Sequence, residues 1–171
     1  IGLFPDVVVS YLLAQCPHHL GLYMALTGDS IDARRAYQLG LVRAVINSKN
    51  VCQLQDNLLQ ADWSRSANEV VDDIIARFTV LTHPPQFTEE DLAIERCLSL
   101  TTLTEAMSVI NSSSDVWAVK AKKSFAHCSP LLLCVVWEQF YRLPGMSFEA
   151  VAAQDLQIVS HALKGDEFFE G

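Results

Sequence analysis

The chain has 171 residues, 50% of them hydrophobic, which is enough to bury one substantial core without disulfides or metals. A formal net charge of −8 and a pI near 5.0 disfavour a direct nucleic-acid partner, because binding to a phosphate backbone normally requires a basic face. No apolar run approaches the roughly 20 residues of a membrane-spanning helix, so we expect no membrane role.

The first 40 residues predict three helices in succession. Apolar residues run almost without a break over residues 7–16, and a second apolar segment covers residues 18–26, so two short buried helices are expected. Ser30 is predicted to cap a third helix that runs to Leu39, because its hydroxyl can accept a free N–H of the first turn. Gly40 then supplies the left-handed residue that commonly ends a helix.

Beyond Ser48 the pattern predicts helix after helix. The double proline Pro84-Pro85 marks an extended connection in this region. Further helices are expected over residues 129–142, which are apolar almost all round, and over residues 147–164. Capping boxes, in which an N-cap hydroxyl and the carboxylate three residues later satisfy each other's backbone N–H, are predicted at Ser66–Glu69, Thr88–Asp91 and Thr102–Glu105.

Residues 41–46 form the one strand that the sequence predicts. A single strand among about eight helices has no partner with which to form a sheet, and the apolar helix faces would bury poorly. We therefore expect the strand to pair with few residues of this chain, and the chain to be part of a larger α/β domain.

The histidines, cysteines and lysines give weak signals for chemistry. Adjacent His18 and His19 point about 100° apart on a helix, and no carboxylate stands at a helpful spacing, so a metal site is not predicted there or at His83. His127 and Cys128 are neighbours in sequence, so their side chains diverge in direction, whereas catalytic pairs usually meet across a fold; a buried or capping role is expected. Two sets complete the inventory: a lysine cluster interpreted as a solvated helix face (Lys120, Lys122, Lys123) and five scattered cysteines interpreted as core residues in a reducing compartment (Cys16, Cys52, Cys97, Cys128, Cys134).

Asp6 is the strongest single candidate for chemistry. It follows Phe4-Pro5 and opens a wholly apolar segment, so its charge is held near a core and must be used or neutralised. The alternative is an N-cap for a helix beginning at Val7, in which the carboxylate accepts a first-turn N–H. The residue pattern by itself favours the cap.

Five stretches of the sequence form a recognisable series. These stretches are Ile1-Gly2-Leu3-Phe4-Pro5-Asp6-Val7, Leu26-Thr27-Gly28, Ala36-x-x-x-Gly40-Leu41-Val42, Cys128-Ser129-Pro130 and the terminal run from Gly165 to Gly171. The first three resemble, in order and spacing over about the first 47 residues, the signature of the enoyl-CoA hydratase/isomerase, or crotonase, family, and the last two resemble its 3-hydroxyisobutyryl-CoA hydrolase branch. The resemblance implies an α/β fold of the ClpP/crotonase spiral type, present as a predominantly helical fragment. Residues 1–47 would end the spiral core, and residues 48–171 would form the C-terminal helical region.

The resemblance also implies a site and a setting. Two backbone N–H groups would polarise a thioester carbonyl, while Asp6 and a Glu expected three residues before Ile1 place and activate the attacking group. Gly2, Phe4 and Pro5 would contact the substrate. Coenzyme A would be part of the acyl-CoA substrate, with no separate cofactor and no metal. Mitochondrial localisation, a missing N-terminal half and self-association through the helical region follow from the same resemblance, so this chain alone is not expected to be active.

Some positions depart from the family pattern. Val8-Val9-Ser10 stands where the family has consecutive glycines, and Gln157 stands where an Arg is usual. A lineage that kept the fold and lost the chemistry would show such changes. The sequence therefore leaves three hypotheses open: a CoA-thioester hydrolase of valine catabolism, a non-catalytic homologue that serves as an assembly component, for example of a mitochondrial ribosome, and an enoyl-CoA hydratase or isomerase.

Overall fold

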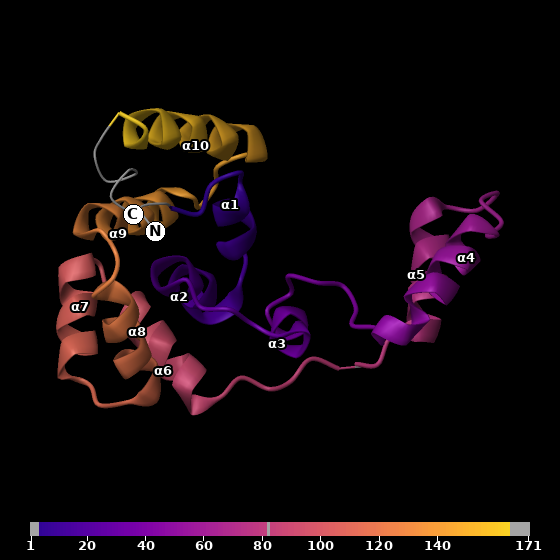
Figure 1. The fold of residues 1–171 in the computed structure, drawn as a ribbon, viewed down its shortest axis with the longest axis horizontal. Helices are drawn as coiled ribbons and strands as arrows, with labels where there is room; N and C mark the ends of the chain where they lie inside the picture. The colour runs from indigo at the N-terminus through magenta and orange to yellow at the C-terminus, as the bar shows by residue number, and fades with distance from the viewer. Residues whose placement is uncertain (1–3, 82, 165–171) are drawn as a thin grey trace. The chain divides into compact units, whose positions relative to one another are not determined.

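A computed structural model describes residues 4–81 and 83–164, in which all regular secondary structure is helical (Figure 1). Two short 3-10 helices, Pro17–His19 and Ser48–Asn50, accompany the α-helices. The described α-helices are α1 Val9–Leu13, α2 Leu20–Thr27, α3 Ala33–Gln38, α4 Val51–Leu59, α5 Ala67–Phe78, α6 Glu89–Leu98, α7 Leu103–Ser112, α8 Val116–Phe125, α9 Pro130–Arg142 and α10 Phe148–Ala162. None of these helices is long and apolar enough to cross a membrane.

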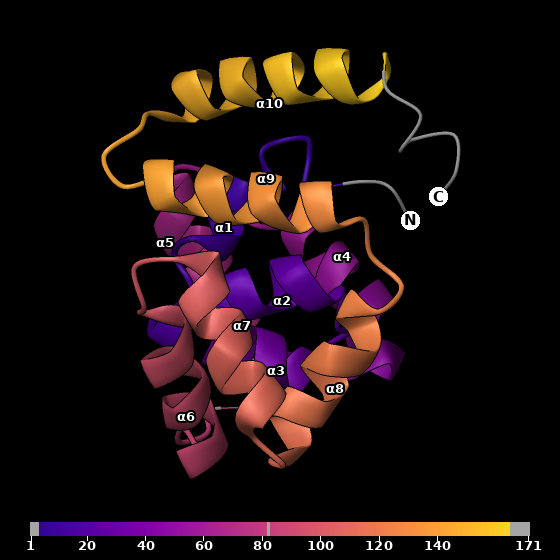
Figure 2. The same cartoon turned by 90° about the vertical axis from the view of Figure 1, so that its left-hand side faces the viewer.

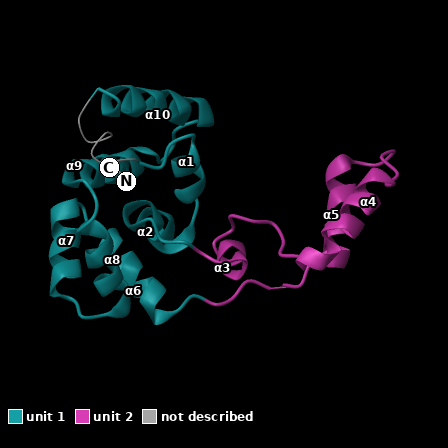
Figure 3. Ribbon diagram, viewed as in Figure 1, with its two compact units in different colours: residues 1–30, 87–171 teal, residues 31–86 magenta. Residues whose placement is uncertain are grey.

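The chain forms two compact units (Figure 3). The first unit joins residues 1–30 to residues 87–171, and the second comprises residues 31–86. The boundary expected near residue 47 concerns the larger domain inferred from the sequence, and it stays a prediction. The first unit contains α1, α2 and α6 to α10, and therefore both the Asp6 segment and the two long helices near the end of the chain.

Helix α2 is the central helix of the first unit. It contacts α1, α6, α8 and α9, and its apolar residues are buried on more than one face, as expected of a helix that is hydrophobic all round. Gly21 allows α1 to approach closely, since a Cβ there would lie only 1.7 Å from the carbonyl oxygen of Leu13. The side chain of Tyr23 donates a hydrogen bond of 2.9 Å to the carbonyl of Trp117 in α8. Burial raises the pKa of Tyr23, so this hydroxyl stays a donor.

The other helices of this unit surround α2. Helix α7 packs against α6 and α8, and α10 lies beside α9 (Figure 2). The apolar run predicted as a buried helix is α9, although only part of its surface is covered. Its buried apolar residues are Leu132, Leu133, Val136 and Trp137.

Helix starts confirm some of the predicted caps and correct others. Thr88 and Thr102 form the predicted capping boxes; in the second, Glu105 N–H donates to Thr102 Oγ1 at 3.2 Å and Thr102 N–H donates to Glu105 Oε2 at 3.1 Å. The box predicted at Ser66 is wrong, because the Ser66 side chain makes no cap hydrogen bond. The cap predicted at Ser30 is also wrong: α3 begins after Asp32, whose carboxylate accepts from Arg35 N–H at 2.7 Å.

The first two helices start later than predicted, and for the same reason. Val7 and Val8 have φ of 53° and 62°, and His18 and His19 have φ of 57° and 54°. Left-handed residues of this kind interrupt a right-handed helix. Helix α1 therefore begins at Val9 rather than Val7, and α2 begins only after the 3-10 turn that contains both histidines.

In the second unit, the strand predicted over residues 41–46 is wrong. The segment is irregular except for one isolated antiparallel bridge between Ile46 and Thr79, supported by a 2.8 Å hydrogen bond from Val80 N–H to the carbonyl of Val45. The expectation that this segment would find few partners is confirmed within the described residues. Gly40 ends α3 with φ of 76°, as predicted, and α4 packs against α5.

The capping differences predict a contrast in stability. Thr102→Ala should lower the free energy of unfolding by about 1 kcal/mol, because the first-turn N–H of Glu105 loses its acceptor, Thr102 Oγ1. Ser66→Ala should change it by less than about 0.5 kcal/mol, since the Ser66 hydroxyl makes no cap bond. Urea unfolding followed by circular dichroism measures both, and equal losses would contradict the assignment.

Candidate functional site

Asp6 lies in a tight turn that leads into α1, and residues 4–8 are called the Asp6 turn below. The Phe4 side chain is buried, whereas Asp6 is half-buried, less than the sequence suggested. The carbonyl of Asp6 accepts a 3.0 Å hydrogen bond from Val9 N–H, but its carboxylate makes no hydrogen bond to another described residue. Gly2, the other residue expected at this site, lies outside the described residues.

The predicted cap role of Asp6 is wrong. The N-cap residue of α1 is Val8, in a left-handed conformation, and no side chain caps the helix from that position. The sequence favoured the cap because an acid directly before an apolar run usually serves that purpose. Two left-handed valines displace the helix start by two residues, so the Asp6 carboxylate is not engaged at the helix end.

A carboxylate distant in sequence meets the helix start instead. Val8 N–H donates a 2.7 Å hydrogen bond to Asp155 Oδ2 from α10. Gln139 of α9 donates from Nε2 to Asp155 Oδ1 at 2.8 Å and to Ser10 Oγ at 3.2 Å, and the same atom lies 3.5 Å from the carbonyl oxygen of Pro5. We call Asp155 and Gln139 the turn clamp. Both are almost completely buried, at 4% and 2% exposed.

The turn clamp was missed in the sequence, although a signal was present. Gln139 is an uncharged polar residue in a helix predicted to be apolar almost all round, and Asp155 lies on a helix expected to bury one face. Buried polar groups are costly unless they are hydrogen-bonded, so a polar residue inside an apolar stripe indicates a partner elsewhere. The partner, a backbone N–H some 147 positions away, has no signature in the sequence.

The backbone held by the clamp is strained. A β-branched residue with positive φ is unusual, and each left-handed residue costs roughly 1–2 kcal/mol relative to a right-handed one. Val7 gains little from burial, as its side chain is 79% exposed. A hydrogen bond to a charged acceptor contributes roughly 1.5–3 kcal/mol, so the Val8–Asp155 bond is of the size needed to hold the strained turn.

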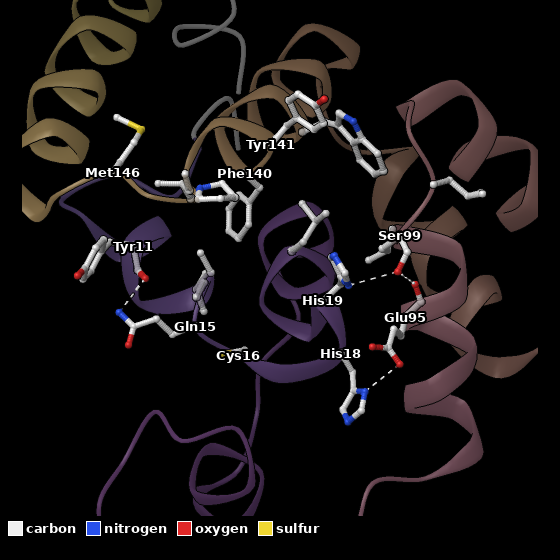
Figure 4. A pocket seen from close by; sticks show the side chains of 18 of the residues that line it. Tyr11, Gln15, Cys16, His18, His19, Glu95, Ser99, Phe140, Tyr141 and Met146 are labelled. Carbon is white, nitrogen blue, oxygen red and sulfur yellow. Dashed lines mark hydrogen bonds and ion pairs between the residues drawn. The ribbon is translucent and has the colours of Figure 1, made fainter.

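A cavity of about 900 Å³ opens on another part of the first unit (Figure 4). It is lined by residues from α1, α2, α6 and α9 and by the link from Leu143 to Met146. His18 Nδ1 pairs with Glu95 Oε2 at 2.9 Å, and His19 Nδ1 lies 3.5 Å from Ser99 Oγ. Two pairs of polar side chains at this cavity thus contact each other, and Phe4, Pro5 and Asp6 are not among the residues that line it.

The other histidines, cysteines and lysines singled out in the sequence do not come together in one site among the described residues. No group of three His, Cys, Asp or Glu side chains suited to a metal ion occurs among residues 4–81 and 83–164. His127 is exposed and Cys128 half-buried in the turn after α8. In the lysine cluster, Lys122 donates from Nζ to the carbonyl of Ser113 at 2.8 Å, whereas Lys120 and Lys123 are exposed.

The cysteines agree only in part with their interpretation as core residues. Cys16 and Cys97 are buried, as predicted. Burial raises the pKa of the Cys97 thiol, which keeps it protonated at the contact of α6 with α7. Cys52 and Cys134 are exposed, so the core interpretation is wrong for these two.

Comparison with known proteins defines the class and then the family. A solved carnitinyl-CoA dehydratase from Mycobacterium thermoresistibile superposes with a TM-score of 0.80 at 23% identity, covering 98% of this chain and 47% of the other. This likeness shows the crotonase-type fold and confirms the expected fold class. The family model for enoyl-CoA hydratase/isomerase matches residues 1–171, and the chain belongs to that family.

Two curated relatives are similar along the whole chain. The mitochondrial 3-hydroxyisobutyryl-CoA hydrolase of Danio rerio is 26% identical over 176 residues, and that of Homo sapiens is 24% identical over 174 residues. Each match covers 100% of this chain but 46% and 45% of the relative. The chain therefore spans about half the length of the curated relatives that it matches.

The strained turn generates a stability prediction. Val7→Gly should raise the free energy of unfolding by roughly 0.5–1 kcal/mol, because relief of a left-handed β-branched residue outweighs the extra chain entropy of glycine. Val9→Gly is the matched control: this valine lies in α1, where glycine should lower the free energy of unfolding by about 1 kcal/mol. Thermal unfolding of both variants measures the difference, and a loss of stability in both would contradict the left-handed turn.

Proposed function

We propose that the full-length protein is an acyl-CoA thioester hydrolase that acts on 3-hydroxyisobutyryl-CoA or a close analogue, as in valine catabolism. The observation that carries this proposal is the match of the entire chain to relatives named 3-hydroxyisobutyryl-CoA hydrolases in Danio rerio and Homo sapiens. Coenzyme A is then part of the substrate, and no separate cofactor is proposed.

Asp6 is the residue proposed to take part in the chemistry. Its carboxylate is half-buried and makes no hydrogen bond to another described residue, so it is available for a reacting group. In the proposed reaction Asp6 orients and activates the attacking group, together with a glutamate expected before Ile1, while two backbone N–H groups stabilise the oxyanion. Phe4, Pro5 and Gly2 are proposed to contact the substrate.

The setting of the protein is part of the same proposal. The relatives in both organisms are named mitochondrial, which supports a mitochondrial location. Self-association through the helical region stays a prediction. Apolar side chains exposed along α10 are compatible with it: Phe148, Leu156 and Leu163.

A non-catalytic homologue is the second candidate function. The observation that favours it is the pair Val8 and Val9, which stand where the family has consecutive glycines; Val8 occupies a left-handed position at the helix start. Glycine adopts that conformation without strain and leaves room for a close approach to the backbone, which valine does not. An enoyl-CoA hydratase or isomerase, which shares the fold, is the third possibility.

Substitution of Asp6 tests the hydrolase proposal. In the full-length protein, Asp6→Asn should lower kcat for 3-hydroxyisobutyryl-CoA about 100-fold or more, because the amide cannot accept a proton or carry the charge. Steady-state kinetics with a thiol reagent for released coenzyme A measures the rate. Asp56→Asn, at an exposed aspartate of α4, is the matched control and should leave kcat unchanged.

Two outcomes would contradict the proposal in different ways. Unchanged turnover in Asp6→Asn would remove Asp6 from the mechanism, although the hydrolase activity itself would stand. A full-length protein that folds but hydrolyses neither 3-hydroxyisobutyryl-CoA nor related acyl-CoA thioesters would favour the non-catalytic homologue. Hydration of an enoyl-CoA, measured as the loss of absorbance of the conjugated double bond, would favour the third possibility.

A further inference from the structure

The turn clamp contacts the backbone on both sides of Asp6. Gln139 Nε2 lies 3.5 Å from the carbonyl oxygen of Pro5, the residue directly before Asp6. Asp155 Oδ2 accepts the N–H of Val8, two residues after Asp6, at 2.7 Å. The two clamp residues bond to each other at 2.8 Å, so the two contacts form one connected unit. The turn clamp thus holds the backbone before and after Asp6, while the Asp6 carboxylate takes no part in these contacts.

The clamp occupies a place where a charge is costly. Asp155 is 4% exposed, and Gln139 and Ser10 are 2% and 0% exposed, so the group is shielded from water. A buried carboxylate is stabilised only when its oxygens accept hydrogen bonds, and here each oxygen has one donor. A helix could be attached to its neighbour by apolar contacts alone, so a buried charge on the backbone of this turn indicates a more specific use.

The left-handed valines show what the clamp prevents. Without an acceptor for Val8 N–H, right-handed φ at Val7 and Val8 would relieve the strain and extend α1 by two residues towards Asp6. Asp6 would then become the N-cap of that longer helix, the role that its sequence context favours. Its carboxylate would turn to the first-turn N–H groups and be lost to a reacting group.

We propose that Asp155 and Gln139 are positioning residues that hold the Asp6 turn in its left-handed form and so keep the Asp6 carboxylate out of a helix cap. This inference rests on the proposed hydrolase function for its effect on turnover, but its effect on the backbone is independent of that function. Both clamp residues contact the backbone around Asp6, so their proposed effect on the reaction is to hold Asp6 in position.

The test compares three variants of the full-length protein. Asp155→Ala removes both acceptors and should lower kcat about 10- to 100-fold with little change in KM, the effect of a displaced catalytic group. Asp155→Asn should recover most of that loss, because its amide oxygen can accept Val8 N–H. Gln139 can then turn its amide so that Oε1, which has no hydrogen-bond partner among the described residues, accepts the new N–H. Ser160→Ala, at an exposed position of α10, is the matched control and should leave kcat unchanged.

A double variant separates positioning from a general loss of structure. If Asp155 acts only through Asp6, then Asp155→Ala should lower kcat no further in a protein that already carries Asp6→Asn. Additive losses would overturn the proposal, and so would an unchanged kcat in Asp155→Ala alone. Equal losses of kcat in Asp155→Ala and Asp155→Asn would overturn it as well, since an amide oxygen that accepts Val8 N–H would then contribute nothing to turnover.

Hydrogen exchange tests the backbone part without any assay of activity. In Asp155→Ala, amide exchange should change in the peptide that covers residues 5–10, while peptides of α2 stay as protected as in the unmutated protein. No change at residues 5–10, or an increase throughout the first unit, would overturn the clamp. If the unmutated protein hydrolyses no thioester, the proposed function fails, and this exchange pattern still decides whether the clamp holds the turn.

Discussion

The hydrogen bond from Val8 N–H to Asp155 fixes the turn on which the proposed function depends. It joins the start of α1 to α10 across 147 positions of sequence, and it does so at a pair of left-handed valines. Helix α1 in turn packs on α2 through the backbone contact at Gly21, and α2 is the central helix of the first unit. The position of Asp6 is therefore set by long-range packing and not by the local preferences of residues 4–8.

Local signals in the sequence predicted much of the helical structure. The capping boxes at Thr88 and Thr102, the left-handed Gly40 and the start of α9 after Ser129 all depend on contacts within four residues. The family resemblance rested on motifs of the same local kind, and the match of the family model to the whole chain confirms it. Where residues close in sequence supply both partners of an interaction, that interaction can be predicted from a single sequence.

The errors share the opposite property. Residues 41–46 were predicted as a strand, but a strand requires neighbouring strands, and the described residues provide one isolated bridge to Thr79. The helix predicted from Val7 did not take into account the hydrogen bond from Val8 N–H to Asp155 of α10. The cap assigned to Asp6 depended on that helix. The turn clamp left a partial signal, a polar Gln139 in an apolar helix, but no spacing or motif in the sequence identifies the backbone N–H of Val8 as the partner of Asp155.

The strained turn bears on the choice between the hydrolase and the non-catalytic homologue. Val8 and Val9 stand where the family has consecutive glycines, which is the argument for lost chemistry, and the left-handed form at Val8 is more costly for valine than for glycine. Yet a turn without a function could adopt a conformation of lower energy, in which α1 extends to Val7 and Asp6 caps it. The structure instead combines the strained backbone with a buried carboxylate that supports it, and the Asp6 carboxylate makes no hydrogen bond to another described residue. Strain of this kind persists only where surrounding contacts enforce it, and it is concentrated at functional sites, so the arrangement favours the hydrolase.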